Sequence, residues 1–458
     1  MNILLVNSCP KFIDDLGFFK RKILKETLNI IPPIGLMYIQ SLLKKKGHNV
    51  RLYDHYLESD IDKLNNLVND FSPDVIGFSS TSPSIKNSDR INNYLKKKYD
   101  FASVLGGAHI TAKPEFLLES NFDYGIMGEG EYGLSQLIEF LEGERKIKDV
   151  TNLIYRGKNG SLKKNKVNRI EMIDFINTPD YSDVNLSRYS PTPASCKRTP
   201  WAHIMTSRGC PFNCKYCDRS IFGQKIIFRS FENIKKEINF LIENQEIREI
   251  RFFDDTFTLN KELVLQVCDF LKDTNLIWTC LTRVDQIDKE MLQKMKESGC
   301  YQLLFGFESG SNEILKKFNK GTTVEQNREA IEMTKKIGMG VRGSFIVGSP
   351  YETKESLEKT LKFALNNDID YVNFNVYENF PGSEIYKENK NVDSSYYAPS
   401  SHEFIPAGMT KDEFSKYVSR MYRKFYLRPN YILKRLKEID SLEQLKFKFY
   451  GALYVLLF

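Results

Sequence analysis

Three of the eight cysteines in this 458-residue chain lie close together, in the segment Ser207-Arg-Gly-Cys-Pro-Phe-Asn-Cys-Lys-Tyr-Cys217. Random placement would give the spacing Cys-x3-Cys-x2-Cys only about 0.002 times per chain. Three thiolates on one loop can hold an iron–sulfur cluster, and in a four-iron cubane they leave one iron open to an external ligand. The alternative is a closed zinc site, which needs a fourth Cys or His; His203 is a candidate.

The composition is that of a globular protein that keeps its thiols reduced. Hydrophobic residues make up 41% and charged residues 27% of the chain, which suits a protein with a sizeable core. Eight cysteines are too sparse for a disulfide framework, and the first residues lack the basic region of a signal peptide. We therefore expect a cytoplasmic protein.

The cysteine loop follows the first of six βα units that we expect to form a partial (β/α)6 TIM-like barrel over residues 201–385. Chemistry in such barrels lies at the carboxyl ends of the strands. Strands are expected at 203–207, 249–255, 277–282, 301–308, 341–348 and 371–377. Helices are expected at 231–243, 261–272, 289–298, 324–337 and 354–367.

With the aromatic Tyr216 before its last cysteine, the motif resembles the signature of the radical S-adenosylmethionine (SAM) superfamily. The resemblance implies a 4Fe–4S cluster on Cys210, Cys214 and Cys217, whose open iron chelates SAM. A one-electron reductant of the ferredoxin or flavodoxin type would reduce the cluster, and cleavage of SAM would give a 5′-deoxyadenosyl radical that abstracts hydrogen. Several strand ends, among them 253–257, 282–285, 306–310 and 344–348, match the superfamily's layout, and the resemblance implies SAM contacts at Asp254, Arg283, Glu308 and Ser309.

Residues 1–145 show a second βα alternation. Their apolar runs do not alternate with polar residues, which indicates strands buried on both faces of a doubly wound, Rossmann-like parallel sheet. Ligands of such sheets bind beyond the carboxyl ends of the strands. Segments rich in glycine and small hydroxyl residues form these ends, and the candidate ligand contacts in them are Ser79, Ser80, Thr81, Gly106, Gly107, Gly128, Glu129 and Gly130.

Four ordered features of this region resemble the cobalamin-binding domain that precedes the barrel in many radical SAM enzymes: 32–36, the helix end at 47–48, 106–109 and 128–131. The resemblance implies that the glycines let a corrin lie against backbone and that the hydroxyls of residues 79–81 contact it. The Asp-x-His-x-x-Gly motif that supplies a cobalt ligand in methionine-synthase-like domains is absent, and His109 is either a ligand or a capping or core residue. A degenerate domain that binds nothing is the alternative.

A connector with local hairpins is expected at 146–200, and a basic helical extension at 386–458. The capping box Thr410–Glu413 opens an amphipathic helix in this extension, and Pro429 ends it. Residues 409–458 hold eleven Lys/Arg and five Asp/Glu, so they contribute most of the net charge of +7. The extension either packs on the barrel and closes its open side or brings the protein to a membrane surface.

These patterns favour a cobalamin-dependent radical SAM enzyme that methylates, or otherwise transforms, an unactivated carbon of a small-molecule or lipid-like substrate. The alternatives are an anaerobic oxidative cyclase like the porphyrin-ester cyclases, which share this architecture, and a cobalamin or metal carrier with structural cysteines. A tRNA methylthiotransferase is disfavoured, because the amino-terminal region has only Cys9 where those enzymes carry three cysteines. No nucleic-acid partner is expected, since the charge outside the tail is nearly balanced.

Overall fold

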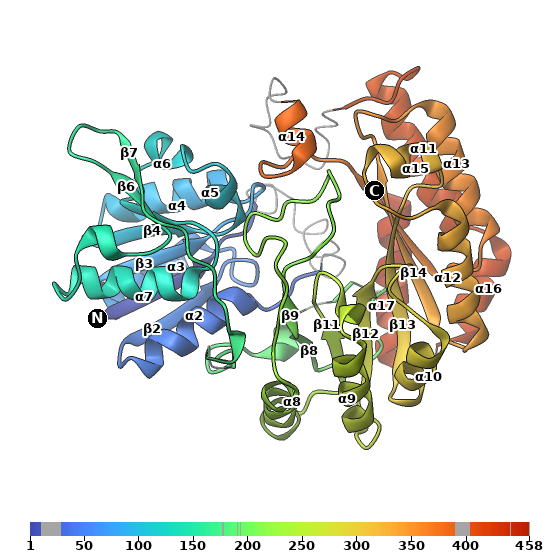
Figure 1. The fold of residues 1–458 in the computed structure, drawn as a ribbon, viewed down its shortest axis with the longest axis horizontal. Helices are drawn as coiled ribbons and strands as arrows, with labels where there is room; N and C mark the ends of the chain where they lie inside the picture. Colours follow the sequence, from blue (N-terminus) through green and yellow to red (C-terminus); the bar gives the residue numbers. More distant parts are fainter. Residues whose placement is uncertain are drawn as a thin grey trace.

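The computed structural model describes residues 1–10, 29–175, 178–189, 191–192, 194–389, 404–439 and 441–457. Two α/β units lie side by side, and helices from the carboxyl-terminal part of the chain cover the far side of the second unit (Figure 1). The predicted Rossmann-like sheet, partial barrel and helical extension are therefore confirmed.

The first unit is built on a seven-stranded sheet, in the order β2-β1-β3-β4-β5-β6-β7. Its strands are β1 (Asn2–Asn7), β2 (Asn49–Asp54), β3 (Val75–Ser79), β4 (Ala102–Gly106), β5 (Tyr124–Ile126), β6 (Leu153–Arg156) and β7 (Leu162–Lys164). The first five are parallel. In the order 2-1-3-4-5 the chain changes direction between β1 and β3, and ligands of such sheets bind at that point beyond the strand ends.

Helices cover both faces of this sheet, as its fully buried strands require. They are α2 (Ile34–Lys45), α3 (Ile61–Phe71), α4 (Ile85–Lys96), α5 (Ala108–Ala112), α6 (Phe116–Glu119) and α7 (Gly130–Leu141). Leu36 of α2 and Leu137 of α7 pack with Leu5 on one face. Leu64 of α3 and Ile91 of α4 pack with Leu4 on the other.

The first sheet extends past residue 145. The hairpin β6–β7 pairs antiparallel with β5, where Leu153 lies opposite Ile126. Leu153 and Ile154 are fully buried, and the turn between the two strands contains Gly160 with φ of +77°. The hairpin therefore continues the first sheet and buries apolar side chains against it.

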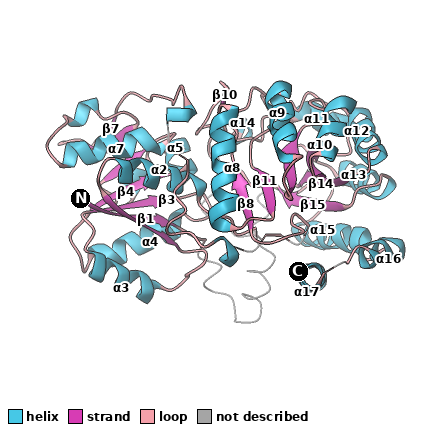
Figure 2. Ribbon diagram, turned by 90° about the horizontal axis from the view of Figure 1, so that it is seen from below, coloured by secondary structure: helices cyan, strands magenta, loops and turns pink. Residues whose placement is uncertain are grey.

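The second unit is a six-stranded parallel sheet in the order β15-β14-β13-β12-β11-β8, whose two edges do not pair. Its strands are β8 (Trp201–Ile204), β11 (Glu249–Phe252), β12 (Ile277–Thr282), β13 (Cys300–Glu308), β14 (Gly340–Val347) and β15 (Tyr371–Val376). Helices α8 (Phe231–Gln245), α9 (Lys261–Leu271), α10 (Lys289–Glu297), α11 (Asn312–Lys317), α12 (Val324–Lys336) and α13 (Lys354–Asn366) follow the outer face (Figure 2). A two-stranded ribbon, β9 (Ser207–Arg208) with β10 (Ile227–Phe228), stands beside β8. Short 3-10 helices lie at Ile147–Asp149, Ile173–Phe175, Leu186–Arg188 and Phe257–Leu259.

The carboxyl-terminal helices are α14 (Glu384–Glu388), α15 (Lys411–Tyr426), α16 (Pro429–Lys437) and α17 (Leu442–Leu457). Of these, α15 contacts β15 at the free edge of the sheet. The predicted capping box is present at Thr410 and Glu413, and Phe414 and Phe425 of α15 are fully buried. Residues 390–403 of the predicted extension lie outside the described part of the chain. Among the described helices none is long and apolar enough to cross a membrane.

Candidate functional site

The cysteine loop leaves the barrel through β9 and is held at both ends by backbone contacts. Gly209 has φ of +94°, and a Cβ there would lie 2.3 Å from the carbonyl oxygen of Lys225, so only glycine fits this turn. The Cys210 N–H donates to the Gly223 carbonyl at 3.2 Å, and the Lys215 N–H donates to the Phe318 carbonyl at 2.9 Å. These contacts fix the loop at the carboxyl ends of the barrel strands, where the sequence predicted it.

Asp254 holds the segment that leads into this loop. Its Oδ1 accepts hydrogen bonds from the backbone N–H and the hydroxyl of Thr206, both at 2.9 Å, and from those of Ser207, at 2.5 and 2.6 Å. Burial raises the pKa of the Asp254 carboxyl to about 6, while these donors oppose the rise. Four donors on one oxygen make Asp254 a brace for residues 206–207, and its Oδ2 is buried with no hydrogen-bond partner in the described part of the chain.

The three thiols of the loop lie close enough to influence one another electrostatically. Burial raises the pKa of the Cys217 thiol to about 12, and the charges of Asp255, Cys214 and Cys210 add to the rise. The Nη1 of Arg283 lies 3.7 Å from the Cys214 sulfur, so a cation stands beside the loop. Among the described residues, no three His, Cys, Asp or Glu side chains are grouped closely enough to surround a single metal ion.

Arg283 links the loop to the end of β12. Its guanidinium makes two hydrogen bonds of 2.9 Å to Asp285 and one of 2.8 Å to the Lys320 carbonyl. It also lies 3.6 Å from the ring centroid of Phe212, within the cysteine loop. Arg283 thus combines a fixed position beside Cys214 with a positive charge.

Glu308 is the centre of a second polar group beside the loop. Its Oε1 accepts hydrogen bonds from the Tyr216 hydroxyl at 3.0 Å and from Lys320 Nζ at 2.9 Å. Its backbone has φ of +62°, a conformation that non-glycine residues rarely adopt and that often marks functional sites. Ser309, by contrast, is fully buried and its hydroxyl faces Thr360 of α13 at 3.2 Å.

Of the four residues predicted to contact SAM, Arg283 and Glu308 therefore stand beside the cysteines, Asp254 braces the loop entry, and Ser309 points into the barrel wall. Sequence reasoning missed Lys320. Its only sequence signal is a glycine and two threonines after it, which do not distinguish it from a surface lysine.

A cavity of about 280 Å³ opens at the carboxyl ends of β1, β3 and β4, between α2 and α7. Its wall includes six glycines: Gly35, Gly77, Gly106, Gly107, Gly128 and Gly130. An added Cβ would meet no atom within 4 Å at Gly35, and only the Phe78 carbonyl oxygen, at 3.8 Å, at Gly106. Packing within the protein therefore does not require glycine at these two positions. The absence of a side chain there leaves the cavity open.

Most of the residues predicted to contact a corrin line this cavity: Ser79, Gly106, Gly107, Gly128, Glu129 and Gly130. Ser80, Thr81 and His109 are not among its lining residues. The Ser80 hydroxyl faces Ser88 at 2.5 Å, and Thr81 is exposed. His109 Nδ1 lies 3.0 Å from the Ser82 hydroxyl, and burial lowers the pKa of its imidazole to about 4, which fits a core histidine. Gly35 and Leu36 of α2 also line the cavity. They belong to the motif at 32–36, but the sequence did not predict that they contact a ligand.

A buried group of three charges joins the glycine-lined cavity to the cysteine loop. Arg208 of β9, two positions before Cys210, makes ion pairs of 2.7 Å with Glu129 and Glu131 at the start of α7. All three side chains are at most 4% exposed. The cavity wall also includes Met205, Ile221 and Phe222, which flank the loop, so the two sites face each other.

Comparisons with known proteins agree with this geometry. Residues 204–364 match the family model of the radical SAM superfamily, and residues 20–138 match that of the B12 binding domain. An uncharacterized methyltransferase of Pyrococcus horikoshii is 33% identical over 425 residues, which cover 89% of this chain and 90% of that protein.

The chain belongs to the radical SAM superfamily.

Two further proteins match this radical SAM enzyme over most of its length. The anaerobic magnesium-protoporphyrin IX monomethyl ester cyclase of Rubrivivax gelatinosus is 27% identical over 413 residues, covering 86% of this chain and 74% of that enzyme. The solved structure of the cobalamin-dependent SAM radical enzyme OxsB with aqua-cobalamin has a TM-score of 0.77 at 18% identity, covering 99% of this chain and 71% of that one. That likeness shows a common fold.

The cofactors of this radical SAM enzyme are a 4Fe–4S cluster, SAM and cobalamin. The residues present fit these groups. Three cysteines on one fixed loop give the donor set of a cubane with one open iron, and the glycine-lined cavity gives a flat ligand access to backbone.

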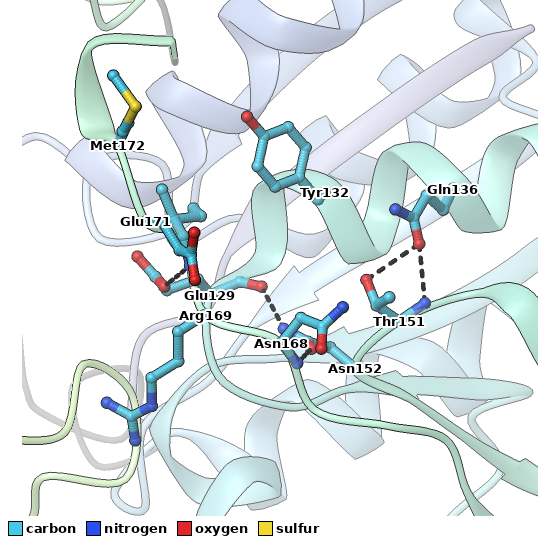
Figure 3. Close-up of a pocket in the computed structure, with 10 residues that line it drawn as sticks. Glu129, Tyr132, Gln136, Thr151, Asn152, Asn168, Arg169, Glu171 and Met172 are labelled. Atoms are coloured by element: carbon cyan, nitrogen blue, oxygen red, sulfur yellow. Dashed lines mark hydrogen bonds between the residues drawn. The ribbon is translucent and has the colours of Figure 1, made fainter.

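Residues of the connector between the two units, Asn168 to Met172, lie beside Glu129 and Asn152 of the first unit (Figure 3). The Ile170 N–H donates to Glu129 Oε2 at 2.8 Å, and the Asn168 N–H donates to Asn152 Oδ1 at 2.7 Å. Asn152 in turn donates to the Glu129 carbonyl at 3.1 Å. Glu129 therefore contacts the connector with one carboxylate oxygen and the barrel, through Arg208, with the other.

Proposed function

We propose that this protein is a cobalamin-dependent radical SAM methyltransferase that methylates an unactivated carbon of a small-molecule substrate. The observation that carries the proposal is the junction at Arg208, where the glycine-lined cavity and the three-cysteine loop share one buried ion group. A methyl donor held in that cavity and a radical generated at that loop would then act on one substrate between them. Relatives named as methyltransferases support the proposal.

We assign the cluster to Cys210, Cys214 and Cys217, and the SAM site to the neighbourhood of Arg283 and Glu308. When bound, the three cofactors supply reductive cleavage of SAM and a transferable methyl group. Arg283 would place its positive charge beside the cluster, 3.7 Å from the Cys214 sulfur. Glu308, whose carboxylate accepts hydrogen bonds from Tyr216 and Lys320, offers an anionic acceptor to the ammonium group of SAM.

The test is an anaerobic assay of the reconstituted full chain with SAM that carries a deuterated methyl group. We expect about four irons and four sulfides per chain, formation of 5′-deoxyadenosine, and transfer of the labelled methyl group to cobalamin. Replacing Cys210, Cys214 and Cys217 by Ala should abolish all three results, whereas Cys268→Ala, in helix α9 away from the loop, should change none.

The oxidative cyclases share this chain's architecture and supply the other outcome of the same assay. Formation of 5′-deoxyadenosine without any labelled methyl group on cobalamin would contradict the methyltransferase proposal and favour radical oxidation of the substrate. One tightly bound zinc and no sulfide would contradict both.

A further inference from the structure

Two arginines are buried inside the barrel and line one cavity. Arg251 on β11 is 9% exposed and Arg342 on β14 is 6% exposed. The cavity measures about 150 Å³ and is also lined by polar side chains of the neighbouring strands, Thr279 and Gln302. A single water needs only ~10–15 Å³, so the space holds a larger group.

Neither guanidinium has a carboxylate within 4 Å among the described residues. Arg251 Nη1 donates to Asn29 Oδ1 at 2.8 Å and to the Ser195 hydroxyl at 3.2 Å, both neutral acceptors. Arg342 Nη2 lies 2.9 Å from the side-chain amide of Asn373, and its Nε is buried with no hydrogen-bond partner among the described residues. Buried cations are normally neutralised by a paired anion, because the desolvation of an unpaired charge is costly.

The charged groups around this cavity are unevenly distributed. Burial, and after it the charge of Arg251, lowers the pKa of Arg342 to about 10, so Arg342 is protonated at neutral pH. Glu249 is hydrogen-bonded to Tyr301 at 2.7 Å, and burial raises the pKa of its carboxyl to about 7, so it compensates only part of the positive charge. Burial also keeps His203 neutral by lowering the pKa of its imidazole.

We propose that the substrate carries an anionic group, a carboxylate or a phosphate, that binds between Arg251 and Arg342 inside the barrel. An oxyanion there would neutralise both cations and supply the acceptor that Arg342 Nε lacks. This inference rests on the proposed function, because it names the substrate class of the same site.

The end of the cavity away from the two arginines is acidic. A substrate with one anionic group is therefore expected to bind in a single orientation. Asp254 and Asp255 line that end, and Asp254 accepts hydrogen bonds from Thr206 and Ser207, which lead into the cysteine loop. An anion is repelled from this end and attracted to the arginines. The part of the substrate remote from its anionic group therefore points toward the cysteine loop.

Anion binding can be measured without knowing the substrate. The full chain with its cluster and cobalamin would be melted in phosphate, in acetate and in chloride of equal ionic strength. We expect phosphate or acetate to raise the Tm by about 2–4 °C at ten times its Kd, and the effective anion distinguishes a phosphate from a carboxylate substrate. Crystals soaked in selenate should show an anomalous peak between Arg251 and Arg342.

Arg342→Met removes one cation and keeps most of the side-chain volume. We expect it to abolish the anion response and the selenate peak and to raise the Tm without added anion, because it removes an unpaired buried charge. Arg328→Met, an exposed arginine on α12, should leave all three unchanged. A wild type that responds to neither anion, or an Arg342→Met variant that melts lower and keeps the selenate peak, would overturn the inference.

The outcome is separable from that of the labelled-methyl assay. An anion site without methyl transfer contradicts the proposed function alone. Methyl transfer without an anion site contradicts this inference alone.

Discussion

Buried carboxylates in this protein differ in the groups that stabilise their negative charge. Glu308 has the ammonium group of Lys320 at 2.9 Å. Glu249 instead accepts hydrogen bonds from the N–H groups of Lys197 and Arg198, at 2.8 and 2.9 Å, and from the Tyr301 hydroxyl. Neutral donors stabilise a carboxylate less than a cation does, so the second kind of site favours the protonated acid.

The pKa of Glu249 predicts how stability depends on pH. Burial raises it from 4.5 to about 7, so the folded state binds the proton more tightly than the unfolded state. The resulting stabilisation is complete below pH 4.5 and is lost as the pH rises through about 7. Glu249→Gln does not titrate, and we expect it to gain on the order of 2 kcal/mol relative to wild type between about pH 5 and pH 8.

Urea denaturation at the two pH values measures this difference. Glu332→Gln, an exposed glutamate on α12, serves as the control and should show no such gain. A Glu249→Gln variant whose difference from wild type is the same at both values would show that Glu249 is ionised throughout.

At the scale of elements, the strand ends carry the site, and the sequence could predict them well. Apolar runs bounded by small residues located β3, β4 and the barrel strands, because a strand buried on both faces has no polar positions to blur the pattern. The directions of individual side chains were harder to predict. Ser80 and Thr81 follow the same strand end as Ser79, but of the three only Ser79 lines the cavity. Their directions depend on the turn into α4, which hydrophobic periodicity does not describe.

Gly106 is the position at which cobalamin binding is best tested. We expect Gly106→Leu to prevent retention of hydroxocobalamin through gel filtration and Gly106→Ala to weaken it less, because the side chain would occupy the open cavity next to β4. The fold should persist, since a Cβ meets only the Phe78 carbonyl oxygen at 3.8 Å.

Gly107 is a poor choice for the same test. Its φ of +101° and the Ser80 carbonyl oxygen 2.5 Å from a built Cβ mean that any side chain distorts the backbone. Full retention of the corrinoid by Gly106→Leu would place the binding site elsewhere.

Helix α15 replaces a neighbouring strand for β15. The Tyr422 hydroxyl accepts from the Phe374 N–H at 3.0 Å and donates to its carbonyl at 3.2 Å. The Tyr426 hydroxyl does the same for Val372, at 3.0 and 2.7 Å. Side chains of the helix thus satisfy the hydrogen-bonding groups of the sheet edge. The helix packs on the barrel, which is the first of the two alternatives that the sequence left open for the extension. The other expectation, contact with a membrane, stays a prediction.

The Tyr426 hydroxyl should therefore contribute to stability. We expect Tyr426→Phe to lower the free energy of unfolding by about 1–3 kcal/mol, because it leaves two backbone groups of Val372 unsatisfied. Tyr417→Phe on the same helix is the matched control and should cost less. Chemical denaturation of the three proteins measures both effects, and equal losses would contradict the edge-covering role.

At the scale of the whole molecule, Arg208 connects the two units. The sequence predicted both units and the glycine-rich end of β5, but it could not predict that Glu129 and Glu131 meet Arg208, because nothing in the local pattern relates residues separated by about eighty positions. The pairing of β6 with β5 is also a contact that the local pattern does not predict, because from the sequence alone β6 is only part of a local hairpin.

Removing Arg208 should leave two carboxylates buried without a cation. We expect Arg208→Met to lower the free energy of unfolding by about 3–5 kcal/mol. Adding Glu129→Gln and Glu131→Gln to that variant should restore part of the loss, because the uncompensated charges are removed as well. A loss below 1 kcal/mol in guanidinium denaturation, or no recovery in the triple variant, would show that the ion group contributes little.

The cover of β15 also matters while the chain is being made. β15 ends at Val376 and α15 at Tyr426, and at about 5–20 residues per second the intervening synthesis takes roughly 3–10 s. During this time the outer row of backbone groups on β15 has no partner, and such a row is a template for pairing with another chain. The nascent barrel is therefore most prone to aggregate just before its last helices emerge, and slower translation lengthens that interval.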